Sequence, residues 1–187
     1  MWCRMHGHGL YSSAALLQGG GLLLLISCTE YVAREIRDRF ERVLVIHESK
    51  LPYGRGWSPL AWQILEGANE VVISLIEAID EIDAGSIYRQ ETVRFEGHEL
   101  AGEIGAIRDE ARLRLAGWAV ENYRACVPAL QTGEVSIYRR RTPEDSRIDP
   151  EQSLSGQFNL LRICTPRFPA FFDLRGHRYE ITLRKSA

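Results

Sequence analysis

Residues 43–67 read VLVIHESKLPYGRGWSPLAWQILEG, and this stretch decides the fold. The run Val43–Ile46 is short and fully apolar, which predicts a strand that is buried on both faces. A histidine and a loop rich in glycine and proline follow it. Ser58 and Pro59 then supply a cap and a first-turn proline, which predicts a helix that ends at Gly67. The stretch therefore predicts a strand, a loop that begins with an imidazole, and a helix.

The segments on either side extend this pattern into an α/β unit. Leu22–Ser27 predicts a second buried strand, and Thr29–Phe40 predicts a helix capped by Thr29. Two further strands and one long helix complete the expected core, at Val71–Ile79, Ser86–Phe95 and His98–Ala125. The alternation of strands with helices predicts a Rossmann-like α/β fold, with a mostly parallel sheet flanked by helices.

The last sixty residues have a different character. Val135–Tyr138 predicts a strand, Asp149 opens a helix that should run to Ile163, and the C-terminal FFDLRGHRYEITLR predicts a hairpin. We therefore expect three parts. Residues 1–21 form an atypical N-terminal segment for which disorder is one interpretation, residues 22–130 form the core, and residues 131–187 form a short β-rich extension.

Composition excludes several classes of function. The formal net charge of −2 provides no large field for nucleic acid or an anionic membrane. The four cysteines form no Cys-x-x-Cys pair, so we expect neither a disulfide framework nor a zinc site, and a reducing cytoplasm fits. Residues 14–28 resemble an apolar signal region, but three glycines interrupt them and the run Leu22–Ile26 is too short to span a bilayer.

Two titratable residues stand where ligands bind in open α/β sheets, beyond the carboxyl ends of strands. His47 ends one expected strand, and Asp83 follows another. A carboxylate beside a histidine fixes its tautomer and favours its protonated form. Spacing alone leaves two interpretations open, a catalytic pair and a structural histidine.

Longer motifs identify a resemblance. The string HESKLP at 47–52, followed by RGWSPLAW at 55–62, is similar to the His-x-Ser-x-Leu-Pro loop of formyltransferases that use 10-formyltetrahydrofolate. The string DAG at 83–85 resembles the Asp-x-Gly that follows the family's next long strand. Weaker matches lie at 141–149 and 169–171. The resemblance covers roughly residues 20–184 and is strongest to small bacterial members that formylate amino sugars.

This resemblance implies a formyltransferase fold and a reaction. An N-formyltransferase would move a formyl group from 10-formyltetrahydrofolate to the amine of an amino sugar, which we expect to be nucleotide-linked, without a metal. The resemblance assigns proton transfer and oxyanion stabilisation to His47 and orientation of His47 to Asp83. Ser49, or a backbone N–H, is the catalytic candidate to replace an oxyanion donor that the family has and this chain lacks. The residues expected to bind the substrates are Leu51, Pro52, Arg55, Gly56, Trp57, Gly85 and Arg141.

Two departures from the family pattern keep alternatives open. Many members have an asparagine where this chain has Val45, and that amide is an oxyanion donor. The N-terminal βαβ unit also looks incomplete, which predicts an exposed sheet edge and allows either a homodimer or a misassigned start codon. A methionyl-tRNA substrate, hydrolysis of formyl-folate, and a truncated inactive relative that serves as a binding subunit are the other interpretations.

Overall fold

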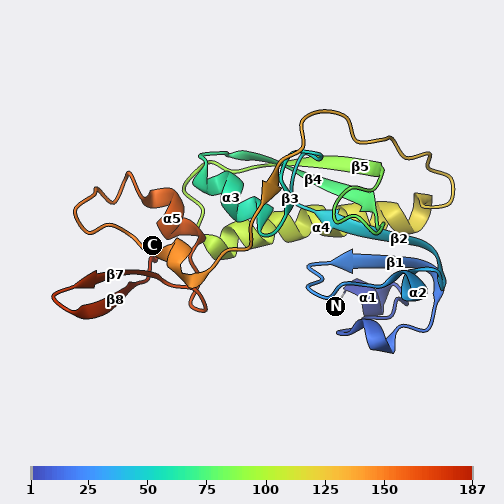
Figure 1. Cartoon of the computed structure of the whole chain (residues 1–187), viewed down its shortest axis with the longest axis horizontal. Coiled ribbons are helices and arrows are strands. Elements are labelled where there is room, and N and C mark those ends of the chain that lie inside the picture. Colours follow the sequence, from blue (N-terminus) through green and yellow to red (C-terminus); the bar gives the residue numbers. More distant parts are fainter. Residues whose placement is uncertain (1, 187) are drawn as a thin grey trace.

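The computed structural model describes residues 2–186 and places a four-stranded sheet at their centre (Figure 1). The strand order is β1, β2, β4, β5, with bounds Gly20–Ile26, Phe40–His47, Glu70–Glu77 and Ile87–Arg94. Strands β1 and β2 are parallel, whereas β4 is antiparallel to both β2 and β5. The α/β fold is confirmed, but the expectation of a mostly parallel sheet is wrong.

The lengths of the connections explain the antiparallel pairs. The only regular helix between β2 and β4 is α3, Pro59–Leu65. Seven helical residues span about 10 Å, whereas an eight-residue strand spans about 26 Å. This helix is too short to carry the chain back along the sheet, so β4 starts near the end of β2. A nine-residue loop, 78–86, likewise lets β5 fold back on β4.

The main core lies between the sheet and the long helix α4, Ala101–Asn122, which runs along one face (Figure 1). Its fully buried members include Leu44, Ile73, Leu75 and Leu115. Burying each aliphatic side chain of this size stabilises the fold by about 1.5–3 kcal/mol. The core therefore fixes the end of β2, which carries His47.

The remaining elements are short. They are α1 (Trp2–Met5), the 3₁₀ turns at Ala14–Leu16 and Pro143–Ser146, α2 (Arg34–Arg37), β3 (Arg55–Gly56), β6 (Ile137–Tyr138), α5 (Phe158–Ile163), β7 (Ala170–Leu174) and β8 (His177–Ile181). Strands β7 and β8 form the predicted hairpin, whose turn residues Arg175 and Gly176 both have positive φ. The hairpin and β1 lie at opposite ends of the molecule (Figure 1).

Two predicted helices are much shorter than expected. The helix expected over Thr29–Phe40 is confined to the four residues of α2, and the chain before it, from Ser27 to Val32, lines a cleft instead. The helix expected from Asp149 begins only at Phe158. Here the Asp149 carboxylate accepts from the Glu151 N–H, at 3.0 Å, which stabilises a turn in place of a helix.

The sheet has an open side at β1. Among the described residues β1 pairs only with β2, and this agrees with the expectation of an exposed sheet edge. Between residues 2 and 186, no helix combines the length and apolar character that crossing a membrane requires.

Candidate active site

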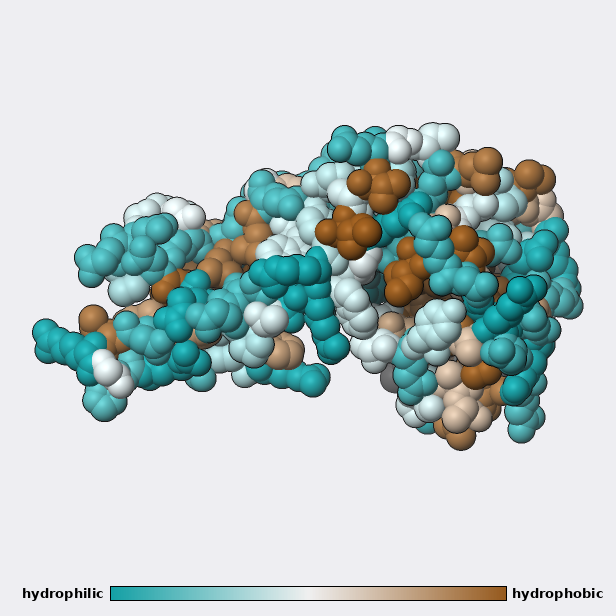
Figure 2. All heavy atoms as spheres, in the orientation of Figure 1, coloured by the Kyte–Doolittle hydropathy of each residue, from teal (hydrophilic) through white to brown (hydrophobic). Residues whose placement is uncertain are grey.

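A cleft of about 750 Å³ lies beyond the carboxyl ends of β1 and β2. Its walls come from the loops after β1 and β4, the start of α3, the first half of α4, and residues 140–146. Figure 2 shows the molecule hollowed between its C-terminal and N-terminal parts. A volume of this size is typical of sites that bind small molecules.

His47 and Asp83 meet in this cleft. The His47 Nδ1 lies 3.4 Å from Asp83 Oδ2, and at most a tenth of either side chain is exposed. The backbone N–H of Gly56 donates to the same carboxylate oxygen at 2.9 Å. The structure therefore brings together the two residues that the sequence analysis paired, and it adds the loop backbone as a third member.

The other ring nitrogen of His47, Nε2, forms a hydrogen bond with the backbone. This nitrogen lies 2.8 Å from the carbonyl oxygen of Gly54. A carbonyl can only accept, so Nε2 carries a hydrogen in the neutral ring and Nδ1 has the free lone pair. Nδ1 is thus the nitrogen that faces the Asp83 carboxylate.

The turn around Asp83 depends on the residues at positions 83 and 85. Asp83 has a φ of 54°, a left-handed conformation that aspartate tolerates better than most residues. A Cβ on Gly85 would stand 1.9 Å from the carbonyl oxygen of Glu77. Only glycine fits there, so the Asp-x-Gly string directs the carboxylate towards His47.

Three of the residues expected to bind substrates line the cleft, namely Gly56, Trp57 and Arg141. The other four, Leu51, Pro52, Arg55 and Gly85, lie outside its lining. Leu51 and Pro52 are buried. The Arg55 guanidinium instead pairs with Glu81 at 2.6 Å and does not face the cleft.

The structure gives no cleft position to Ser49, whereas Val45 lines the cleft. Ser49 is fully buried outside the cleft lining, and its Oγ has no hydrogen-bond partner among residues 2–186. Val45, by contrast, lines the cleft as His47 does. The geometry therefore gives Ser49 no path to a ligand without rearrangement.

The cleft carries positive charge, of which the Arg108 side chain was not expected from the sequence. Arg108 and Arg140 line it together with Arg141. The Arg140 guanidinium stacks 4.9 Å from the Trp57 ring centroid. Neither Arg140 nor Arg141 has a carboxylate within ion-pair distance in the described part of the chain, and the Nε of Arg141 is buried without a partner. The Arg141 guanidinium donates to the Asp145 carbonyl at 3.3 Å and to the Ser146 Oγ at 3.4 Å, neither of which neutralises its charge.

A short turn supports this basic wall. The Asp145 carboxylate accepts from the Thr142 N–H at 2.6 Å and from Arg139 at 2.8 Å. The Arg139 guanidinium, with help from Thr142, lowers the pKa of Asp145 below its ordinary value of 3.8. Since the folded-state pKa is lower, the stabilisation is complete above pH 3.8 and is lost as the pH falls further.

We expect Asp145→Asn to lower the free energy of unfolding at pH 7 by about 1 kcal/mol, because Arg139 and Thr142 lose a charged acceptor. Urea denaturation at a series of pH values measures the difference from the parent protein. That difference should shrink as the pH falls below 3.8. A difference that is independent of pH would contradict the assigned cause.

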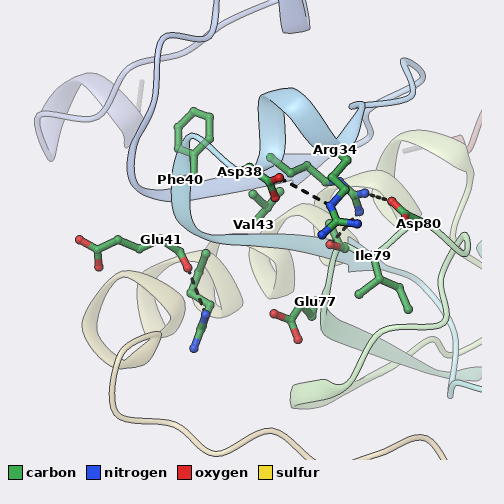
Figure 3. Close-up of a pocket in the computed structure, with 11 residues that line it drawn as sticks. Arg34, Asp38, Phe40, Glu41, Val43, Glu77, Ile79 and Asp80 are labelled. Carbon is green, nitrogen blue, oxygen red and sulfur yellow. Dashed lines mark hydrogen bonds and ion pairs between the residues drawn. The ribbon is translucent and has the colours of Figure 1, made fainter.

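A second, smaller cavity of about 330 Å³ lies between α2 and the start of β2. Its charges neutralise one another: Arg34 faces Asp38 at 3.6 Å, and Arg37 pairs with Asp80 (Figure 3). Within the described residues, no group of three or more His, Cys, Asp or Glu side chains is arranged to hold a metal ion. The larger cleft is therefore the candidate active site.

Comparison with known proteins gives the cleft a context. No model of a known protein family matches the chain. Over 140 residues the chain is 24% identical to the methionyl-tRNA formyltransferase of Lactobacillus acidophilus, a match that covers 73% of this chain and 44% of that protein. The chain thus spans less than half the length of this relative.

Solved structures extend the likeness. The methionyl-tRNA formyltransferase from Clostridium thermocellum superposes with a TM-score of 0.77 at 27% identity, over 89% of this chain and 72% of that one. A sugar N-formyltransferase from a Shewanella species gives a TM-score of 0.71 at 18% identity, over 89% and 70%. HypX from Aquifex aeolicus in complex with tetrahydrofolic acid gives 0.74 at 19% identity, over 87% and 29%. The expected resemblance to formyltransferases is confirmed, and the chain has their fold.

Proposed function

We propose that this chain transfers a formyl group from 10-formyltetrahydrofolate to the amine of a nucleotide-linked amino sugar. The observation that carries the proposal is the arrangement of His47, Asp83 and the Gly56 N–H at the wall of the cleft. The sequence strings that carry His47, Gly56 and Asp83 are also those that resemble the formyltransferases. Sugar and methionyl-tRNA formyltransferases share this fold, so the choice of acceptor rests on the basic wall of the cleft.

The cleft offers two kinds of wall for two substrates. Apolar side chains from β1, β2, β4 and the loop after β4 line it: Leu25, Val45, Ile76, Ile79 and Ile82. Such a wall suits the flat heterocycle of a folate. Arg140 and Arg141 line it from the segment after β6, and guanidinium groups that have no carboxylate partner among the described residues suit the phosphates of a nucleotide.

The chemistry follows from the two ring nitrogens of His47. The substrate amine attacks the formyl carbon, a new carbon–nitrogen bond forms, and a tetrahedral oxyanion results. His47, held by the Gly54 carbonyl at Nε2, exchanges a proton at Nδ1 and stabilises the developing charge. Collapse of the intermediate breaks the bond to the folate nitrogen, which receives the proton that the amine loses. Asp83, whose carboxylate lies 3.4 Å from Nδ1, orients the ring.

Mass spectrometry of reaction products tests the proposal. The purified protein is incubated with 10-formyltetrahydrofolate and a panel of nucleotide-linked amino sugars, and one product should gain the mass of a formyl group. Parallel reactions contain methionyl-tRNA or water as the only acceptor. Formylated tRNA or free formate would assign a different acceptor. Absence of any product, together with no thermal shift on adding 5-formyltetrahydrofolate, would instead indicate an inactive relative.

We expect Arg141→Met to raise the KM for the nucleotide-linked sugar about tenfold with little change in kcat. The reason is that a guanidinium that binds a distant phosphate contributes equally to substrate and transition state. Steady-state kinetics at saturating folate measure the effect. Arg184→Met is the matched control, since Arg184 is exposed near the C-terminus and away from the cleft lining. A lower kcat at unchanged KM would contradict phosphate binding by Arg141.

A further inference from the structure

Gln131 contacts the Asp83 turn through its side-chain amide. Its Nε2 donates to the carbonyl oxygens of both Asp83 and Gly85, each at 2.8 Å. Its Oε1 accepts from the Arg55 guanidinium, with the nearer nitrogen at 2.8 Å. Both ends of the amide are therefore fully used, and none of the sequence motifs includes this residue.

These contacts close a ring of hydrogen bonds around Asp83. Gln131 holds the backbone of Asp83 and also Arg55. The next residue, Gly56, donates its N–H to the Asp83 carboxylate at 2.9 Å. Arg55 also pairs with Glu81, two residues before Asp83. The ring thus fixes Asp83 at its main chain and at its carboxylate at once.

The fold determines where Gln131 stands. Ala129 forms an isolated antiparallel bridge with Ile87, with hydrogen bonds of 2.7 Å and 2.9 Å. Ile87 is the first residue of β5 and follows the Asp83 turn almost directly. Residues two apart in extended chain face the same side, so the bridge presents the Gln131 amide to the turn.

We propose that Gln131 is a positioning residue for formyl transfer, which acts by holding Asp83 against His47. The inference rests on the proposed function for its kinetic consequence, but its structural part stands alone. Asp83 has a left-handed backbone, a conformation that persists only where surrounding contacts impose it. Gln131 supplies two of those contacts and couples the turn to the loop that carries Gly54 and Gly56.

The test uses Gln131→Met, which keeps the length of the side chain and removes its hydrogen bonds. We expect kcat to fall roughly 10–100-fold, because a displaced catalytic group loses its alignment. The KM for each substrate should stay within about threefold of the parent value. In ¹⁵N-histidine-labelled protein, the ring signals of His47 should shift in the direction seen in Asp83→Asn.

A second variant separates positioning from folding. Gln131→Glu still accepts from Arg55 but sets a carboxylate against two carbonyl oxygens, and it should shift the His47 signals as Gln131→Met does. Gln152→Met is the control, since Gln152 is exposed in the turn that follows Asp149. Unchanged His47 signals in both Gln131 variants would overturn the proposal, even if activity fell. The signals need no substrate, so they remain decisive if the parent protein transfers no formyl group.

Discussion

Replacing His47 with glutamine is expected to lower the rate of formyl transfer by about 10²–10⁴-fold. Glutamine can still donate to the Gly54 carbonyl, at the position where His47 Nε2 now lies 2.8 Å away. It has no second nitrogen to exchange a proton beside Asp83. The variant therefore keeps the loop in place and removes the acid–base group alone.

The measurement is the rate of formyl-sugar formation under single-turnover conditions, with folate binding followed separately by thermal shift. His177→Gln provides the control, because His177 is exposed in the C-terminal hairpin. We expect the His47 variant to bind folate nearly as tightly as the parent protein does. Transfer at the parental rate would remove His47 from the chemistry and leave the cleft as a binding site.

The largest expected effect on stability is at Arg162. Its side chain is completely buried, and its guanidinium lies 3.5 Å from the Glu99 carboxylate. It also donates to Asn69 and Asn159, at 3.0 Å and 2.9 Å. These contacts join α5 to the turn before β4 and to the start of α4. Burial lowers the pKa of Arg162, and Glu99 only partly compensates.

We expect Arg162→Met to lower the free energy of unfolding by about 3 kcal/mol, because it leaves Glu99 buried without its cation. Burial would raise the pKa of Glu99, but the N–H groups of Glu96 and Gly97 outweigh it and lower that pKa. Because these N–H groups still stabilise the Glu99 carboxylate in Arg162→Met, they reduce the expected loss of stability. Urea denaturation measures it, and Arg178→Met in the exposed hairpin is the control.

The double variant Arg162→Met with Glu99→Gln sharpens this test. Removing both charges should recover part of the stability, since a buried pair is often replaceable by neutral groups. Arg162→Met alone could lower the free energy of unfolding by less than about 1 kcal/mol, as the loss of an exposed ion pair does. That result would show that Arg162 does not anchor α5. A double variant less stable than the single one would show that Glu99 is stabilising without its partner.

Local features of the fold could be predicted from the sequence because short-range chemistry determines them. The strand that ends at His47, the helix that starts at Pro59 and the turn at Gly176 depend on neighbouring residues. Even so, Ser58 does not act as the expected side-chain cap. It has a φ of 53° and makes no capping hydrogen bond.

The site could be predicted only as far as its motifs extend. His47 and Asp83 lie in recognisable strings, and the fold brings them together. The Gly54 carbonyl could not be predicted, since every residue has one. Gln131 lies 48 residues from Asp83, and nothing in its neighbourhood signals the contact. The direction of β4 depends on how the chain returns through α3, which local patterns do not specify.

The pairing of β3 with β6 has a consequence for the order in which the protein matures on the ribosome. The Gly54 N–H bonds to the side chain of Ser136, 82 residues later, and Trp62 donates to the Arg139 carbonyl, 77 residues later. Chains fold from the N-terminus as they emerge. The loop that holds His47 therefore reaches its final contacts only after residues 136–139 have been synthesised.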